Sequence, residues 1–234
     1  MNGTSQSALV RCADVARTYG QGDGAVVAVH GSSCQVPAGA RIAIVGPSGS
    51  GKSTLLHVMA GLEVPTAGMV TWPALSQSLS QSLSQRIQQI GVVFQSPSLI
   101  PALTVVENTA LPLVLAGMAE YQTHNRVDEA MRLVGVEHLA NQLPEELSGG
   151  QAQRVAVARV LAQQPALILA DEPTGQLDTT TGQHLVDVLL AVAARIGAAL
   201  VVTTHDRDVA GRFADRWTMR EGRLLTGAST AVGL

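Results

Sequence analysis

Lysine is almost absent from this chain of 234 residues, since Lys52 is the only lysine among its fifteen Lys and Arg residues. The formal net charge is −3, and no run of basic residues occurs. Proteins that bind nucleic acid need a cluster of basic side chains to neutralise phosphates. The composition therefore argues against a nucleic-acid partner.

Aromatic residues are also scarce, at 3% of the chain, although hydrophobic residues reach 46%. The core must then be filled by Ala, Val, Leu and Ile, a composition that suits an α/β protein with a buried parallel sheet. The length fits one large domain, or a domain with a subdomain inserted into it.

Cysteine is limited to Cys12 and Cys34, which form no Cys-x-x-Cys motif. We expect free thiols in a reducing cytoplasm and no metal site built on them. No basic segment followed by an apolar run opens the sequence, so no signal peptide is expected. The apolar stretch 111–118 contains Pro112 and is well short of the roughly 20 residues that span a bilayer. Any membrane role would thus come through a partner.

The apolar pattern predicts strands and helices in alternation, interrupted by a helical block. Strands are expected at 9–15, 26–30, 41–45, 69–72, 90–94, 167–170 and 200–203. Helices are expected at 52–60, within 103–139, at 148–162 and at 180–195. Between them, residues 76–85 read SQSLSQSLSQ, a low-complexity repeat expected to be a surface loop or an irregular helix without function.

The strongest motif is a glycine-rich loop between a strand and a helix, made of Gly46, Pro47, Ser48, Gly49, Ser50, Gly51, Lys52, Ser53 and Thr54. Its glycines allow backbone N–H groups to wrap phosphate oxygens, and the helix N-terminus adds positive potential. Lys52 would reach the β- and γ-phosphates of ATP, and the Ser53 hydroxyl would coordinate Mg²⁺.

A second motif is the apolar strand that ends in Asp171 and Glu172. Ligands of open α/β sheets lie beyond the carboxyl ends of the strands, where this pair would emerge. Asp171 would hold Mg²⁺, and Glu172 would act as general base on the attacking water.

A third motif, Leu147-Ser148-Gly149-Gly150-Gln151, stands at the start of a predicted helix. A helix cap requires Ser148 but neither glycine, so the pair of glycines indicates a second surface that faces a phosphate. The helical block separates this surface from the glycine-rich loop within one chain. Two copies arranged head to tail would let each donate one surface to each ATP.

With these three motifs in this order, the chain resembles the nucleotide-binding subunits of ABC transporters over nearly its whole length. The resemblance implies an α/β fold: a P-loop NTPase core with a parallel sheet, an N-terminal antiparallel β subdomain and an inserted α-helical subdomain. The core with its β subdomain would comprise 1–95 and 165–234, and the helical subdomain 96–164.

The resemblance also implies roles for four single residues. Gln95 is similar to the glutamine that touches Mg²⁺ and senses the membrane partner, and Asp178 to the aspartate that crosses the dimer interface. His205 is similar to the histidine that contacts the γ-phosphate, and Tyr19 to the aromatic residue that stacks on adenine. A polar strand end, a surface histidine and a packing tyrosine are the alternatives for Gln95, His205 and Tyr19.

Within the family, three features resemble the branch of lipoprotein-release and macrolide-export ATPases: Tyr19-Gly20, Glu107-Asn108 followed by Leu111-Pro112-Leu113, and the segment 171–178. Gln176 departs from the asparagine common in that branch. The resemblance implies a separate permease that transmits motion, which contacts 96–107 and holds the chain at the cytoplasmic face of the membrane. A cell-division ATPase and a soluble ATPase of cofactor assembly are the alternatives.

Overall fold

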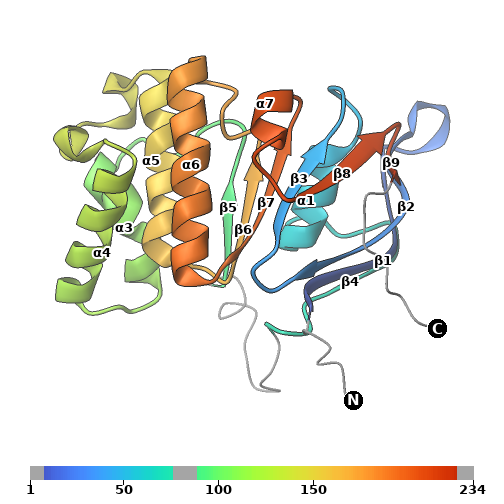
Figure 1. Ribbon diagram of the computed structural model, residues 1–234, viewed down its shortest axis with the longest axis horizontal. Coiled ribbons are helices and arrows are strands. Elements are labelled where there is room, and N and C mark those ends of the chain that lie inside the picture. Colours follow the sequence, from blue (N-terminus) through green and yellow to red (C-terminus); the bar gives the residue numbers. More distant parts are fainter. Residues whose placement is uncertain (1–7, 76–88, 226–234) are drawn as a thin grey trace. The chain divides into compact units, whose positions relative to one another are not determined.

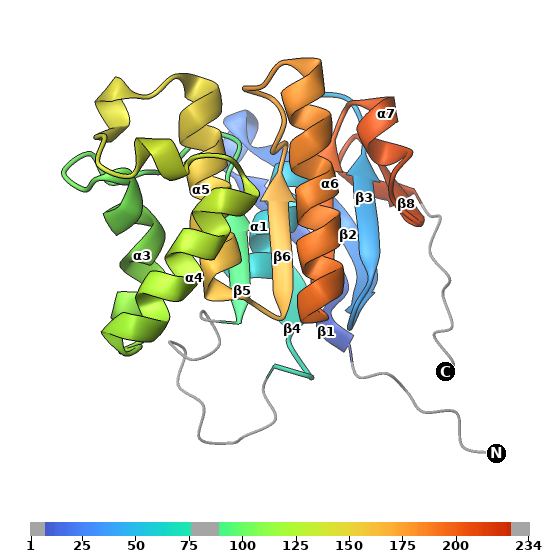
Figure 2. The same cartoon turned by 60° about the vertical axis from the view of Figure 1, so that its left-hand side comes forward.

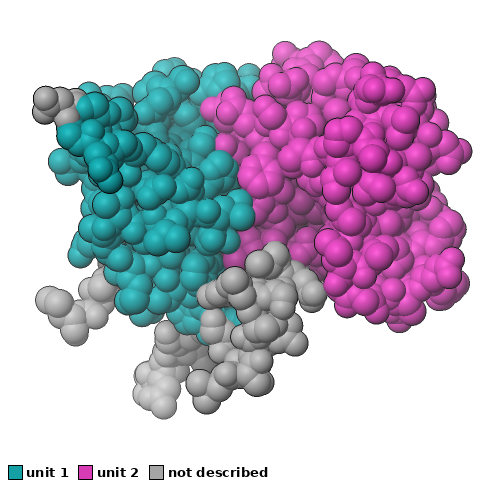
Figure 3. Space-filling view, turned by 180° about the vertical axis from the view of Figure 1, so that it is seen from behind, with its two compact units in different colours: residues 1–79, 201–234 teal, residues 80–200 magenta. Residues whose placement is uncertain are grey.

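The computed structural model describes residues 8–75 and 89–225, so the repeat at 76–85 lies outside the described residues. The chain divides into two compact units, which Figure 3 colours separately. Unit 1 comprises residues 1–79 and 201–234, and unit 2 comprises residues 80–200. Each unit has its own arrangement of strands and helices.

A three-stranded antiparallel sheet forms much of unit 1, in the order β2-β1-β4 (Figure 1). Its strands are β1 (Ala8–Tyr19), β2 (Val26–Pro37) and β4 (Ala67–Thr71). Strand β1 extends four residues beyond the predicted end at Val15, because it pairs with β2 as far as Tyr19 opposite Val26. Cys12 lies opposite Cys34 in this ladder, and both thiols are free and buried. The predicted N-terminal antiparallel sheet is confirmed.

The remainder of unit 1 surrounds strand β3 (Arg41–Val45), which pairs in parallel with β8 (Asp215–Arg220). Strand β9 (Arg223–Leu225) pairs antiparallel with β8. Sequence reasoning missed both β8 and β9. Helix α1 (Lys52–Ala60) follows β3 and ends before Gly61, as predicted, and the glycines at its two ends, Gly51 and Gly61, are left-handed. The short elements are η1 (Gly22–Gly24) and α7 (Arg207–Ala210), and strand β7 (Ala199–Thr204) begins in unit 2 and ends in unit 1.

Unit 2 combines a parallel strand pair with helices. Strands β5 (Ile90–Val93) and β6 (Leu167–Asp171) pair in register, with Gly91 opposite Ile168. Helices α3 (Val105–Leu115), α4 (Glu120–Leu133) and α5 (Gly149–Gln163) pack on one another (Figure 2). The other elements are α6 (Thr179–Ile196), η2 (Glu137–Leu139) and η3 (Pro144–Glu146).

The core is aliphatic, as the composition predicts. All five residues of β6 are buried, and Leu167, Ile168 and Leu169 have no exposed surface. Such a strand, apolar on both faces, is typical of a parallel sheet covered on both sides. Within residues 8–75 and 89–225, no helix has the length and apolarity that a bilayer crossing requires.

Candidate functional site

The glycine-rich loop in unit 1 closes around the side chain of Lys52. Its ammonium group donates hydrogen bonds to the carbonyls of Gly46 (2.9 Å) and Pro47 (3.0 Å). Only 4% of the lysine surface is exposed. Gly49 and Gly51 have φ of 75° and 95°, a left-handed conformation that glycine adopts without steric cost. The loop therefore has the curvature and the single buried cation that a phosphate cradle needs.

Glycine is also required in this loop because other backbone segments approach it closely. A Cβ atom on Gly46 would lie 2.2 Å from the carbonyl oxygen of Met219, and one on Gly51 would lie 2.1 Å from that of Ala28. The N–H of Gly222 donates to the carbonyl of Ser50 (3.0 Å). Sequence reasoning missed Met219 and Gly222, since only strand β8 and the turn after it bring them to the loop.

A cavity of about 470 Å³ opens beside this loop within unit 1. It is lined by Val45, Gly46, Pro47, His205, Asp206, Arg207, Ala210, Arg216, Thr218 and Arg220. The fold thus brings the predicted site residue His205 to the start of the glycine-rich loop. Three arginines and one aspartate line this cavity, and their net positive charge favours anionic ligands.

Tyr19 also belongs to unit 1, at the end of β1. The guanidinium carbon of Arg17 lies 4.6 Å from the centroid of its ring. Cation–π contacts of this kind fix both the cation and the ring. One face of the tyrosine is therefore covered by Arg17.

In unit 2, Asp171 and Glu172 occupy the carboxyl end of β6. Asp171 is 2% exposed, and Glu172 has φ of 44°. A residue other than glycine in the left-handed region is strained by about 1–2 kcal/mol. The turn that follows is fixed by a hydrogen bond from the N–H of Gly175 to the carbonyl of Glu172 (3.0 Å). Backbone strain of this kind clusters at active sites, where it holds a side chain in the orientation that its function requires.

Ser148 caps helix α5, as predicted. Its hydroxyl accepts a hydrogen bond from the N–H of Gln151 (3.2 Å), and its own N–H donates to the Gln151 side chain (2.7 Å). This reciprocal capping box fixes both polar residues of the motif.

The two glycines between them pack against the loop that leads to Asp178. A Cβ atom on Gly149 would lie 2.7 Å from Oε1 of Gln176, and one on Gly150 would lie 3.0 Å from Cδ2 of Leu177. Asp178 itself caps α6 by accepting from the N–H of Thr181 (3.0 Å). Unit 2 thus brings residues 148–151 next to the segment that ends at Asp178.

Gln95 follows β5 in unit 2 and is exposed. The residue before it is held by α5, because the fully buried Gln153 donates from Nε2 to the carbonyl of Phe94 (3.2 Å). Arg159 of the same helix donates to the carbonyl (2.8 Å) and hydroxyl (2.9 Å) of Ser98. Helix α5 therefore carries the capping motif at one end and anchors the segment around Gln95 along its side. Sequence reasoning missed Gln153 and Arg159.

Comparison with known proteins agrees with this geometry. The profile of the family described as "ABC transporter" matches residues 29–175. The lipoprotein-releasing system ATP-binding protein LolD of Legionella pneumophila (strain Lens) is 41% identical over 213 residues, which cover 89% of this chain and 93% of LolD. LolD of the Paris strain is 40% identical over the same coverage.

Solved structures give the same result. The dimeric ATP-binding cassette MJ0796 in a post-hydrolysis state with ADP and Pi superimposes with a TM-score of 0.83 at 34% identity, over 93% of this chain and 97% of that one. A second dimeric structure of MJ0796, a bacterial ABC transporter cassette, gives 0.84 at 36% identity over the same shares. CbiO1 of Clostridium perfringens, part of the transporter complex cbiONQ, gives 0.77 at 29% identity over 94% of this chain and 88% of that one.

Taken with the glycine-rich loop around Lys52, the capping motif at Ser148 and the carboxylates after β6, these likenesses show that this chain belongs to the ABC transporter family as an ATP-hydrolysing subunit.

Proposed function

We propose that two copies of this chain close around two ATP molecules. Their closure drives a separate permease, which transmits this motion. The observation that supports the proposal is that the loop around Lys52 and the capped glycines after Ser148, each suited to a phosphate, lie in different compact units of one chain. In a head-to-tail pair, the γ-phosphate held by one copy would be touched by Ser148 of the other.

Within each site, residues 46–54 hold the phosphates through backbone N–H groups and the Lys52 ammonium. Tyr19 stacks on the adenine, and His205 contacts the γ-phosphate. Glu172 accepts a proton from the attacking water as general base. Ser148, Gly149, Gly150 and Gln151 contact the γ-phosphate from the opposite copy, and Asp178 crosses the interface.

The donor set suits Mg²⁺, which prefers oxygen ligands. Asp171 offers a carboxylate that burial shields from water, Ser53 a hydroxyl and Gln95 a side-chain carbonyl. When bound, the metal neutralises charge on the phosphates. Asp171, Ser53 and Gln95 would hold and orient it.

The permease contact is proposed on residues 96–107. This segment is anchored on its inner side by Arg159 at Ser98 and by Asn108 at Ile100, so a push on it would reach α5 and the Ser148 motif. The similarity to LolD, a lipoprotein-releasing ATP-binding protein, supports a permease of that type and a position at the cytoplasmic face of the membrane.

The dimer is tested with Glu172→Gln, which removes the general base while keeping the side-chain volume. Light scattering with ATP and Mg²⁺ should show a dimer, and without nucleotide a monomer. Adding Ser148→Arg to this variant should leave ATP binding intact and abolish the dimer, because the arginine would occupy the place of the phosphate from the other copy. A strictly monomeric Glu172→Gln protein, alone and beside its permease, would refute the proposal.

The partner is tested by affinity capture from detergent-solubilised membranes. Capture of a permease with few membrane spans and a large domain outside the membrane would support the proposal that the permease transmits motion. If its extracytoplasmic domain binds a cell-wall hydrolase, the cell-division alternative replaces transport, and recovery of soluble proteins alone refutes both.

A further inference from the structure

Tyr19 lies at the end of β1 with 38% of its surface exposed. Residues two apart on a strand share a face, which places the Arg17 side chain beside the tyrosine ring. The guanidinium carbon is 4.6 Å from the ring centroid, so it covers one face of the ring. A planar base can then stack on only one side of Tyr19.

Arg17 is itself held by a carboxylate. Its Nη2 lies 2.8 Å from Oε2 of Glu63, and the two side chains are 26% and 29% exposed. An arginine paired with a partly buried carboxylate has little rotational freedom. Its Nε is also buried and has no hydrogen-bond partner among the described residues. The guanidinium is therefore fixed by Glu63 and by the tyrosine.

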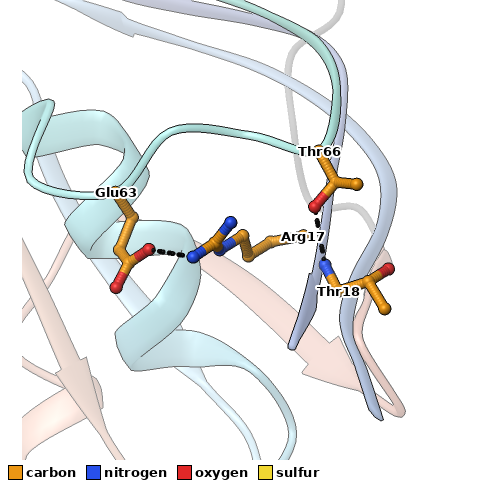
Figure 4. A network of polar contacts seen from close by, with 4 residues as sticks. All are labelled: Arg17, Thr18, Glu63 and Thr66. Atoms are coloured by element: carbon orange, nitrogen blue, oxygen red, sulfur yellow. Dashed lines mark hydrogen bonds and ion pairs between the residues drawn. The ribbon is translucent and has the colours of Figure 1, made fainter. Parts of the chain in front are cut away.

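Glu63 lies three residues beyond the end of helix α1, the helix that begins at Lys52. The segment 63–66 is also joined to β1 by two hydrogen bonds. The N–H of Thr18 donates to Oγ1 of Thr66 (3.0 Å), as Figure 4 shows beside the Arg17–Glu63 pair. The N–H of Thr66 in turn donates to the carbonyl of Ala16 (2.7 Å). The end of β1 is thus attached to the far end of the helix that carries Lys52.

We propose that Arg17 is a positioning residue for nucleotide binding: anchored by Glu63, it holds the Tyr19 ring at a fixed place relative to the phosphate loop and leaves one ring face for the base. The inference rests on the proposed stacking of Tyr19 on adenine. Arg17 and Glu63 should therefore affect the binding of the adenine base and leave the binding of the triphosphate unchanged.

The test compares the dissociation constants of two ligands, ATP and inorganic tripolyphosphate, by calorimetry with Mg²⁺. Arg17→Met keeps the length of the side chain but removes the cation. It should weaken ATP binding about threefold, the scale of a partly exposed cation–π contact, and leave tripolyphosphate binding unchanged. Glu63→Gln should act in the same direction by releasing the guanidinium.

Three further variants separate positioning from a general loss of structure. Arg17→Lys keeps a cation and should retain most of the ATP affinity that Arg17→Met loses. Arg11→Met, the same change at an exposed position of the same strand, should alter neither ligand. In Tyr19→Ala, ATP binding should weaken about tenfold, the scale of stacking for one base, and adding Arg17→Met should weaken it no further.

The outcomes distinguish the inference from the function on which it rests. If Tyr19→Ala leaves ATP affinity unchanged, the proposed stacking is wrong and the inference falls with it. If Tyr19→Ala weakens ATP binding but Arg17→Met and Glu63→Gln do not, only the inference is wrong. An equal loss of tripolyphosphate affinity in Arg17→Met would mean that Arg17 acts on the phosphates or on folding, and would also overturn it.

Discussion

The N–H of Gly222 donates a hydrogen bond of 3.0 Å to the carbonyl of Ser50, and so ties the turn between β8 and β9 to the glycine-rich loop. The carbonyl of Gly222 accepts from the N–H of His30 (2.8 Å). One glycine near the end of the described chain therefore joins the phosphate loop to the β2 strand.

Gly222→Ala tests this support. Gly222 has φ of 73°, and its Cβ would lie 2.6 Å from Cδ2 of His30 and 2.9 Å from the carbonyl oxygen of Ala28. We expect a loss of about 2–3 kcal/mol in the free energy of unfolding, from left-handed strain plus crowding, and several-fold weaker ATP binding. Urea denaturation and calorimetry measure the two effects.

Gly197→Ala is the matched control. Gly197 has φ of 69°, but a Cβ atom there would meet nothing within 4 Å. Strain alone should cost about 1 kcal/mol, with ATP affinity unchanged. Equal effects of the two variants on ATP affinity would contradict a role for the Gly222 turn.

The backbone conformation of Glu172 should lower the stability of the protein, while its carboxylate is needed for ATP hydrolysis. Its φ of 44° is unfavourable for glutamate, whereas asparagine tolerates this conformation. Glu172→Asn should therefore raise the free energy of unfolding by about 0.5–1 kcal/mol and abolish ATP hydrolysis. Glu172→Gln keeps the strain, so it should lose hydrolysis without gaining stability, and a similar gain in both would contradict this explanation.

Replacing Asn108, in helix α3, should destabilise the protein. It is fully buried, accepts from the N–H of Ile100 (2.8 Å) and donates to the carbonyls of Ile100 (3.1 Å), Leu103 (2.8 Å) and Thr104 (3.1 Å). Asn108→Leu leaves the N–H of Ile100 and the carbonyl of Leu103 without these partners and should cost about 2–4 kcal/mol in unfolding free energy. Hydrogen exchange should rise at residues 100–104.

The control for that prediction is Asn141→Leu, because Asn141 is exposed. Its effect should stay within about 0.5 kcal/mol. If exchange at residues 100–104 rose no more in the Asn108 variant than in this control, Asn108 would not organise the segment.

Acid should weaken the cap of helix α6. Hydrogen bonds from the side chain and the N–H of Thr181 hold the pKa of Asp178 below its ordinary value. The charged cap therefore stabilises the folded state above the pKa of an unfolded aspartate, near 3.9, and this contribution is lost as the pH falls through the lower folded value. The stability difference between the parent and Asp178→Ala should shrink on acidification below about pH 4.

Asp178→Asn provides the comparison, since asparagine caps a helix without a charge. The difference between Asp178→Asn and Asp178→Ala should depend little on pH. A parent–Asp178→Ala difference that stayed constant or grew in acid would contradict the assigned cause.

Much of the fold follows from local sequence. Strand β3 and helix α1 have the predicted bounds. The elements β6, α5, α6 and β7 begin and end within one residue of their predicted bounds. These segments have an unbroken apolar run or a marked boundary, such as Gly61 after α1 and Ser148 before α5. Signals of this kind are read within a few neighbouring residues.

The missed elements lack such signals. Strands β8 and β9 contain Arg216, Arg220 and Arg223, and Glu221-Gly222 is a weak turn signal compared with Asn-Gly. Both turn residues have positive φ (48° and 73°), as a two-residue hairpin turn requires. Pairing with β3 makes β8 a strand, and that pairing cannot be read from residues 215–220 alone.

The order of residues along the chain determined the family and the motifs, because a phosphate loop, a helix cap and a strand end are each built from consecutive residues. The tertiary structure alone decided that Gly222 supports Ser50, that Gln153 holds Phe94, and that Glu63 anchors Arg17 against Tyr19. Hydrogen bonds and ring contacts act over only a few ångströms, so partners far apart in sequence meet only after the chain has taken its path.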